Sequence, residues 1–144
     1  MIEHIFRYEK ILELLNDFTP YFTSLRTGSV NTIDLAKKLH LYGTVIQIRE
    51  NDKTVGFAAF YHNDTVNNYA YLSLIAISSF FEGKGYGSIL LSEVERISLE
   101  SGMRAIKLQV YKSNSHALAF YIRHGYIVTG NDSDVLLNMM KALL

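Results

Sequence analysis

The fold of this chain is decided by the stretch Ile75-Ala76-Ile77-Ser78-Ser79-Phe80-Phe81-Glu82-Gly83-Lys84-Gly85-Tyr86-Gly87-Ser88. It completes a strand predicted from Tyr69 to Ser78, and the lack of charge there predicts burial on both faces. Three glycines at alternate positions follow, and they lead into a helix predicted from Ser88 to Ser101. Glycine lets the backbone turn tightly and approach a ligand closely. Because the free amides of the loop and of the helix start would converge, we expect an anion site for a phosphate or pyrophosphate.

Two familiar phosphate-binding motifs do not account for this loop. The dinucleotide fingerprint requires Gly-x-Gly-x-x-Gly and an acidic residue closing the next strand, but the spacing here is Gly-x-Gly-x-Gly and that strand ends near Gln109. The P-loop requires Gly-x-x-x-x-Gly-Lys-Ser/Thr, and Lys84 lies between two glycines instead. A glycine-rich turn with a purely structural role is the remaining alternative.

Hydrophobic periodicity gives the elements on either side of this segment. Apolar residues recur at three- and four-residue steps over 8–18 and again from Asn31 or Thr32 to Leu41, which predicts two helices separated by a loop over 19–30. The other predicted elements are strands at 45–48, 54–61, 105–111, 126–129 and 135–140, and a short helix over 113–124. This order predicts one α/β (α+β) domain over residues 1–144, with a mixed sheet and flanking helices.

Composition excludes several classes of protein. The chain has 144 residues, 14 Lys+Arg, 14 Asp+Glu and no Cys. Zero net charge argues against a nucleic-acid partner, because phosphate neutralisation dominates such binding. Without Cys there is no disulfide, thiolate metal site or Cys nucleophile, and the five scattered His residues predict no metal site. No apolar run is long enough for a signal peptide or a membrane span, so we expect a cytoplasmic protein with no membrane partner.

A second motif lies downstream of the glycine loop. Asn114 and Ala117 open the predicted helix, Phe120-Tyr121 continue it, and Gly125-Tyr126 follow it. Taken alone, this is an Asn-capped helix with an aromatic face. Together with the glycine loop, at this distance and in this order, it resembles the GNAT acetyltransferase superfamily. The usual loop signature, Gln/Arg-x-x-Gly-x-Gly/Ala, corresponds to Glu82, Gly85 and Gly87, and Glu82 departs from it.

The resemblance implies a mixed, mostly antiparallel central sheet of the acyl-CoA N-acyltransferase type. A V-shaped gap would separate the strand ending at Ile77 from the strand starting near Ala105, and acetyl-CoA would lie in it as co-substrate. Asn114 would hold the cofactor arm or the local backbone, and Tyr121 would reach the thioester sulfur. The pantetheine would pair with the backbone of Ile75, Ala76 and Ile77, and the pyrophosphate would lie on Glu82, Gly83, Lys84, Gly85, Tyr86, Gly87 and Ser88.

Acetyl transfer to an amine requires an oxyanion donor, an acid and a base. A backbone N–H near Ile77 would serve as the donor, and Tyr121 would protonate the departing sulfur. Some members of the superfamily carry the base as a Glu four residues before the pantetheine-binding stretch, where this chain has Tyr71. The base therefore stays open among His62, Asp64, Glu50 and water relayed through Ser73 and Tyr71. Since there is no Cys, direct attack by the amine in a ternary complex is expected.

The front half of the chain is expected to select the acceptor. Arg26 would either meet an acceptor carboxylate or phosphate or be a solvated loop residue. We expect a small-molecule amine, with an amino sugar as one candidate, and a homodimer through the sheet edge or the last strand. A protein or peptide N-acetyltransferase and a non-catalytic acyl-CoA-binding domain are the alternatives. Aromatic residues that could line an acceptor pocket are Phe18, Tyr21, Phe22, Tyr61, Tyr69 and Tyr71.

Overall fold

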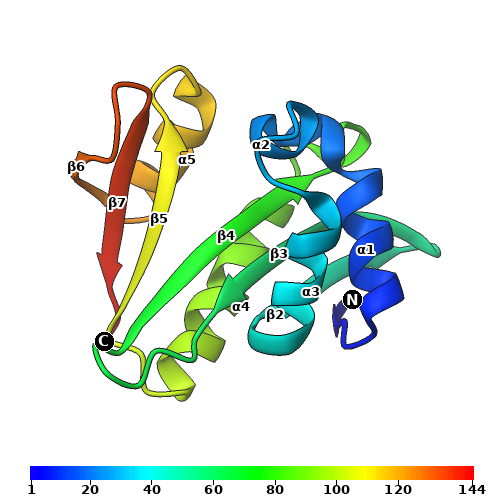
Figure 1. The fold of residues 1–144 in the computed structure, drawn as a ribbon, viewed down its shortest axis with the longest axis horizontal. Helices are drawn as coiled ribbons and strands as arrows, with labels where there is room; N and C mark the ends of the chain where they lie inside the picture. The colour runs from blue at the N-terminus through cyan, green and yellow to red at the C-terminus, as the bar shows by residue number, and fades with distance from the viewer.

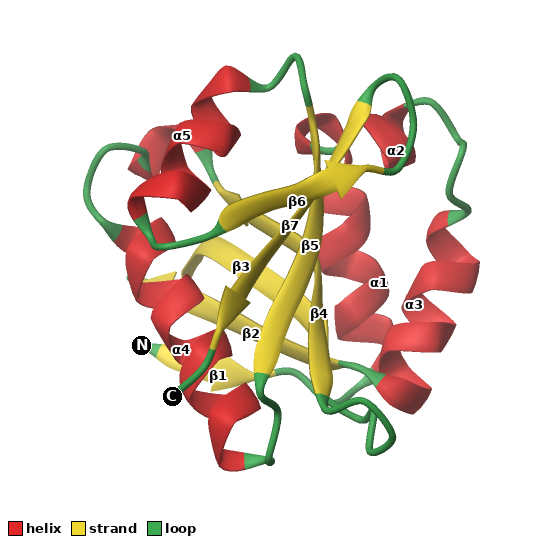
Figure 2. Cartoon of the chain, turned by 90° about the vertical axis from the view of Figure 1, so that its left-hand side faces the viewer, coloured by secondary structure: helices red, strands yellow, loops and turns green.

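The computed structural model describes residues 1–144 as a seven-stranded sheet with helices on both faces (Figures 1 and 2). The strands lie in the order β1-β2-β3-β4-β5-β7-β6, and every neighbouring pair is antiparallel except β4–β5. In chain order the elements are β1 (Ile2–His4), α1 (Tyr8–Asp17), η1 (Thr19–Tyr21), α2 (Thr23–Arg26), α3 (Thr32–Tyr42), β2 (Thr44–Glu50), β3 (Lys53–Tyr61), β4 (Tyr69–Ile77), η2 (Ser79–Phe81), α4 (Tyr86–Glu100), β5 (Ala105–Tyr111), α5 (Ser115–Arg123), β6 (Ile127–Asn131) and β7 (Leu136–Ala142). The predicted mixed, mostly antiparallel sheet with flanking helices is confirmed.

The front of the chain departs from the sequence prediction in two places. Residues 19–30 contain η1 and the short helix α2 rather than only a loop. The buried Leu25 anchors α2, which is too short to show a hydrophobic period. The strand β1 was not predicted either, because only three residues form it and their pairing with β2 supplies its order.

The two faces of the sheet carry separate cores. On one face α1, α2 and α3 bury a cluster that includes Leu15, Leu39 and Phe57. On the other face α4 and the C-terminal segments bury a cluster that includes Leu90, Ile106 and Tyr126. Figure 2 shows the first three helices on one side of the sheet and α4 and α5 on the other. Both faces of the central strands are therefore covered over most of their length.

The strands β4 and β5 diverge after a short paired segment. Their parallel ladder joins only Tyr69–Tyr71 to Ala105–Lys107, although β4 continues to Ile77 and β5 to Tyr111. The strand β5 stays paired with β7 along its whole length, so it moves away from β4 together with β7 (Figure 1). The V-shaped gap predicted between these two strands is confirmed.

A bulge in β4 lies where the gap opens. Ala59 pairs with Leu74 while Phe60 pairs with Leu72, which leaves Ser73 without a partner on β3. A bulge bends its strand and increases the local twist. The bulge therefore helps to turn the end of β4 away from β5.

The prediction that β4 is buried on both faces is wrong for its first half. Ala70 and Leu72 are buried, but the alternate side chains Tyr69 and Tyr71 remain 38% and 37% exposed. Tyr71 lines a cavity rather than packing under a helix. Tyr69 lies beneath Lys107, whose Nζ is 4.0 Å from the ring centroid.

Candidate active site

The glycine loop adopts a conformation that glycine alone reaches without strain. Gly83 has φ 76° and Gly85 has φ 86°, and a Cβ at either position would meet nothing within 4 Å. These two positions therefore require glycine because of their backbone conformation, since a side chain there would meet no steric clash. The helix α4 begins at Tyr86, two residues before the predicted start, and its first amides have no intrahelical partner. The N-terminal end of a 15-residue helix thus faces the loop, as an anion site requires.

The third glycine has a packing role. A Cβ on Gly87 would lie 3.3 Å from Cε1 of Phe120, so this glycine lets α4 approach α5 closely. The two sequence motifs meet at this contact. Gly87 also lines the cavity described next.

A cavity of about 410 Å³, which we call the glycine-loop cavity, lies between the end of β4, the loop and α5. Nearly all of the predicted cofactor-binding residues line it. They are Ile75, Ala76, Ile77, Glu82, Gly83, Gly85, Tyr86, Gly87, Ser88, Asn114 and Tyr121. The exception is Lys84, whose ammonium lies 5.9 Å from the ring centroid of Phe81 and does not line the cavity.

Two basic side chains that the sequence reasoning missed also line the glycine-loop cavity. They are His116 and Arg123, both on α5. Together with Phe120 they recur at steps of four and three residues, the spacing of one helix face. That spacing was available in the sequence and could have placed them beside the loop. Arg123 supplies positive charge to a site in which Glu82 is the acidic exception.

The edge of β4 that faces the gap has no strand partner beyond Tyr71. On its other side Ala76 and Ile77 still pair with Phe57 and Gly56 of β3. The backbone over 75–77 is therefore held firmly on one side and is free to pair on the other. An extended chain with amide groups would bond there as an additional short strand.

Asn114 and Tyr121 anchor the second motif at the junction of two cavities. The Asn114 side chain caps α5 by accepting a hydrogen bond of 3.1 Å from the amide of Ala117, which is the local-backbone alternative predicted for it. Tyr121 is buried, 8% exposed, and burial raises the pKa of its phenol well above the ordinary value. A phenol in that state keeps its proton at neutral pH and can act as a hydrogen donor.

A second cavity, of about 450 Å³, lies in the gap between β4 and β5, and we call it the β4–β5 cavity. No charged side chain is among its 19 lining residues. Hydroxyl and amide groups face it from Tyr71, Ser73, Gln109 and Thr23. It shares five lining residues with the glycine-loop cavity: Tyr21, Ile75, Asn114, Ala117 and Tyr121. The two cavities thus meet at the Tyr121 side chain.

Tyr71 lies on the β4–β5 cavity with its phenol protonated. Burial raises the pKa of Tyr71, and the negative charge of Asp132, from the turn between β6 and β7, raises it further. Tyr71 in turn contributes to the raised pKa of Tyr121. These two predicted catalytic tyrosines are therefore close enough for Tyr71 to affect the pKa of Tyr121.

The structure does not bring His62 to either cavity. Its Nε2 lies 2.8 Å from the Thr44 hydroxyl oxygen, its ring packs 5.5 Å from the Phe60 ring, and burial lowers its pKa. Phe60, two residues earlier on the same face of the strand, belongs to the core beneath α4. The other two candidate bases, Asp64 and Glu50, do not line the cavities either, and Asp64 accepts hydrogen bonds from the amides of its own turn.

The predicted aromatic pocket is only partly assembled. Tyr21, Phe22 and Tyr71 line the β4–β5 cavity, whereas Phe18 is buried in the core under α1. Tyr61 is half-buried with its hydroxyl unpaired, under the ammonium of Lys38. The Arg26 guanidinium donates to the carbonyl of Pro20 and does not line the cavity.

Tyr21 has a connecting role that the sequence did not reveal. Its phenol oxygen accepts a hydrogen bond of 2.8 Å from the amide of Ser79, at the exit of β4. The Ser79 side chain, then this amide, and to a smaller extent the Ser78 side chain lower the pKa of Tyr21 through hydrogen bonding. The hydrogen bond thereby connects η1 to the start of the glycine loop. The Tyr21 side chain lines both cavities.

Two further observations bear on the kind of site. No group of three or more His, Cys, Asp or Glu side chains is arranged to hold a metal ion. None of the helices is long and apolar enough to cross a membrane.

Comparison with known proteins agrees with this arrangement. The spermine/spermidine N(1)-acetyltransferase of Bacillus subtilis (strain 168) is 30% identical over 101 residues, 66% of this chain and 66% of that protein. The curated relatives are matched over 33% to 66% of their own length.

Two solved structures share the fold at low sequence identity. The aminoglycoside 6'-acetyltransferase type Ii has a TM-score of 0.79 at 16% identity, over 100% of this chain and 97% of that one. The PaiA N-acetyltransferase of Thermoplasma acidophilum, solved with coenzyme A, has a TM-score of 0.72 at 17% identity, over 99% of both chains. The model of the acetyltransferase (GNAT) family matches residues 8–126. This chain therefore belongs to the GNAT family of acetyltransferases.

Proposed function

We propose that this protein transfers the acetyl group of acetyl-CoA to the primary amine of a small molecule, with both reactants bound together. The observation that carries the proposal is the meeting of two chemically different cavities at Tyr121. One has the glycine loop and the N-terminus of α4, which suit a diphosphate. The other is uncharged and rich in hydroxyl groups, which suits a small polar acceptor.

The residues of the glycine-loop cavity fit coenzyme A. The open space beside Gly83 and Gly85 leaves room for a diphosphate against the backbone, and the free edge of 75–77 suits the amides of a pantetheine arm. Arg123 would add a positive charge, which offsets the carboxylate of Glu82. When bound, acetyl-CoA would supply an activated acetyl group as its thioester.

Tyr121 is proposed as the general acid. Its raised pKa keeps the phenol protonated, so its hydroxyl can donate a hydrogen bond to a departing thiolate, along which the proton would pass as negative charge develops on the sulfur. The unpaired backbone N–H groups of β4 near Ile77 are the proposed donors for the carbonyl oxygen. Binding both reactants in adjoining cavities would supply a large part of the rate enhancement through proximity.

The proposed base is water, to which the proton would pass along the hydroxyl groups of Tyr71 and Ser73. Both side chains line the β4–β5 cavity, and none of His62, Asp64 and Glu50 does. Tyr71 is unsuited to be the base itself, because its raised pKa holds the phenol in the protonated form. Tyr71 would instead orient the amine and help to pass the proton of the amine to solvent.

We favour an amino sugar as acceptor within this class. Sugars present hydroxyl groups and apolar ring faces, which match the hydroxyl and aromatic side chains of the β4–β5 cavity. A polyamine such as that named for the Bacillus relative carries several positive charges, and no acidic side chain lines the cavity to bind them.

A screen for CoA release over an amine panel tests the proposal. The panel contains amino sugars, polyamines, amino acids and a lysine peptide, each with acetyl-CoA and with a no-amine blank. Rapid CoA release with at least one small amine is expected. Binding of CoA without release for any amine would instead support the non-catalytic acyl-CoA-binding alternative, and release with the peptide alone would support a protein acetyltransferase.

A further inference from the structure

His124 lies behind the glycine loop and contacts it through one hydroxyl group. Its Nε2 is 2.8 Å from Oγ of Ser88, in the first turns of α4, and its Nδ1 is 2.8 Å from the carbonyl oxygen of Phe120. Ser88 lines the glycine-loop cavity and His124 does not. The histidine ring also packs 4.5 Å from the ring of Phe120. The two motifs are therefore joined by a polar contact as well as by the packing of Gly87.

The contact to Phe120 fixes the tautomer of the neutral ring. A carbonyl oxygen can only accept, so Nδ1 carries the hydrogen and donates it. The other nitrogen then has a lone pair, and Ser88 must donate its only hydroxyl hydrogen to it. In this state the Ser88 hydroxyl presents only lone pairs to the cavity and cannot donate a hydrogen bond to an anion.

Protonation of His124 reverses this hydrogen bond. The protonated ring donates from both nitrogens, so Nε2–H donates to Ser88 and Nδ1–H still donates to the Phe120 carbonyl. The Ser88 hydroxyl hydrogen is then free to donate into the glycine-loop cavity. Toward the cavity, where a diphosphate would lie, one proton on His124 therefore turns the Ser88 hydroxyl from an acceptor into a donor.

We propose that His124 is a positioning residue for the cofactor, which takes up a proton when the diphosphate binds and aims the Ser88 hydroxyl at it. This rests on the proposed function, because it requires coenzyme A in the glycine-loop cavity. Binding of the diphosphate and protonation of His124 favour one another by linkage. The affinity for coenzyme A therefore rises as the pH falls through the range in which histidine titrates.

Other charged groups surround this contact. Carboxylates, lysines and arginines ordinarily titrate outside the range of pH 6 to 8, and the one other imidazole among these groups is that of His116. His116 is therefore the control residue. The groups are Glu82 and Lys84 on the loop, His116 and Arg123 on α5, and Glu95 of α4 paired at 3.0 Å with Lys141 of β7, beside Gly125.

Calorimetric titration with dephospho-CoA tests the proposal on the native protein. This probe keeps the diphosphate but lacks the 3'-phosphate, whose own titration near pH 6 would obscure the result. Titrations at about pH 6, 7 and 8, in buffers of different ionisation enthalpy, report both affinity and proton uptake. We expect proton uptake on binding and a dissociation constant roughly tenfold lower at about pH 6 than at pH 8, since a charge-assisted hydrogen bond contributes about one power of ten.

Three variants locate the linked proton. In His124→Gln and in Ser88→Ala we expect a dissociation constant that no longer depends on pH, and in His116→Gln we expect the native dependence. Ser88→Ala leaves His124 in place, so a pH dependence that survives in it overturns the relay through the hydroxyl. It also provides a test if His124→Gln fails to fold. Native binding without pH dependence or proton uptake overturns the proposal while acetyl transfer stands, whereas no binding of CoA or dephospho-CoA at any pH overturns both.

Discussion

At the scale of single residues, the site depends on a phenol that belongs to both cavities. Tyr121 is buried where the glycine-loop and β4–β5 cavities meet, with its proton retained. Asn114, by contrast, has its side chain engaged in capping α5. Of the residues that the second motif brings to the cavities, which also include Ala117 and Phe120, Tyr121 is the one with a reactive side chain.

Replacement of Tyr121 by Phe should slow the reaction and leave cofactor binding in place. We expect kcat to fall by about 100-fold or more, as is typical for loss of a general acid, with little change in the KM for acetyl-CoA. Steady-state kinetics with the best amine of the panel measure both constants. Tyr126→Phe is the matched control, because Tyr126 is a buried phenol that donates to Glu95 outside the cavities. An unchanged kcat in Tyr121→Phe would remove this residue as the acid.

Replacement of Gly85 by Ala should weaken binding of coenzyme A through the backbone alone. The left-handed conformation at φ 86° costs an alanine about 1–2 kcal/mol of folding stability. Gly102 is the control, since it has φ 91°, is equally open and lies outside both cavities. Urea unfolding should show similar losses for the two variants, and calorimetry should show weaker CoA binding for Gly85→Ala only. Equal CoA affinities would mean that the loop backbone does not bind the diphosphate.

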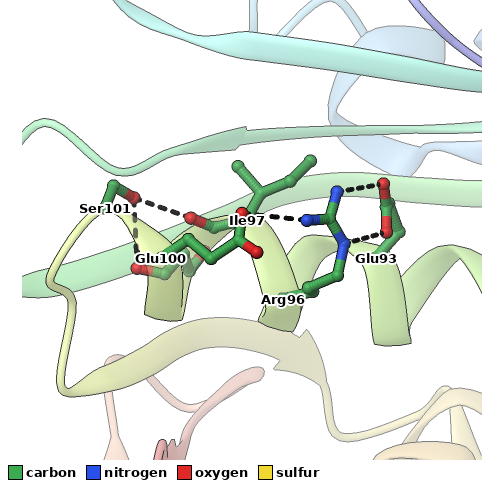
Figure 3. A network of polar contacts seen from close by, with 6 residues as sticks. Glu93, Arg96, Ile97, Glu100 and Ser101 are labelled. Atoms are coloured by element: carbon green, nitrogen blue, oxygen red, sulfur yellow. Dashed lines mark hydrogen bonds and ion pairs between the residues drawn. The ribbon is translucent and has the colours of Figure 1, made fainter.

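At the scale of elements, α4 joins the site to the rest of the molecule. Its N-terminus faces the glycine loop, its buried face packs under the sheet, and its exposed face carries an ion-pair network. Figure 3 shows Arg96 between Glu93 and Glu100, with both carboxylate oxygens of Glu93 accepting hydrogen bonds of 2.7 Å. This network lies toward the end of the helix away from the loop. It therefore concerns the stability of α4 and not the chemistry.

The network should make folding sensitive to acid. The hydrogen bonds from Arg96 lower the pKa of Glu93 below its ordinary value of 4.5. Its stabilising contribution is therefore complete above that value and is lost as the pH falls through the lower folded-state pKa. Glu93→Gln should show a shallower fall in stability than the native protein below about pH 4.5. Urea unfolding as a function of pH measures the slopes.

The control for this prediction is Glu13→Gln. Glu13 is a helical carboxylate on the surface of α1, and a single contact of 3.4 Å joins it to Lys10. It should keep the native acid dependence, and CoA binding at neutral pH should be unchanged in both variants. A Glu93→Gln slope equal to that of the native protein would count against the ion pair as a source of acid sensitivity.

At the scale of the whole molecule, the sheet consists of two parts with a narrow connection. The strands β1 to β4 form one part and β5, β7 and β6 form the other, and only three residue pairs of β4 and β5 join them. The proposed cofactor would contact both parts, because the glycine-loop cavity is lined by β4 on one side and by α5 on the other. Binding should therefore stabilise the molecule as a unit.

Coenzyme A should raise the melting temperature and protect selected amides. At a ligand concentration of 100 times Kd the stabilisation is about 2.7 kcal/mol, or roughly 10 °C for a chain of this size. Hydrogen exchange should slow at β4 beyond Tyr71, in the glycine loop and in α5, with β2 unchanged. Thermal shift and exchange mass spectrometry measure these effects. Protection confined to β2 and β3, or no shift at all, would contradict the proposed cofactor site.

Much of the molecule was predictable from local sequence. The glycine spacing, the Asn cap of α5 and the hydrophobic periods placed most helices and strands within a few residues, because backbone conformation and amphipathic burial depend on neighbours in the chain. The exceptions were short elements: the turns η1 and η2, and β1 and α2, of which the last two owe their order to tertiary pairing and to one buried side chain. The family resemblance supplied the prediction of the gap and the expectation of acetyl-CoA as co-substrate, neither of which periodicity alone gives.

What only the tertiary structure decided concerns residues far apart in the chain. The divergence of β4 and β5, the exclusion of His62 and the Tyr21–Ser79 bond depend on strand register and on which face each side chain takes. The contact of Ser88 with His124 joins residues 36 positions apart. The sequence by itself determined that a glycine-rich loop before a helix and an aromatic helix exist, because each is coded locally. Packing of the whole sheet determined that the loop and the helix meet at Tyr121 and that His124 contacts both, since long-range contacts follow only from the folded arrangement.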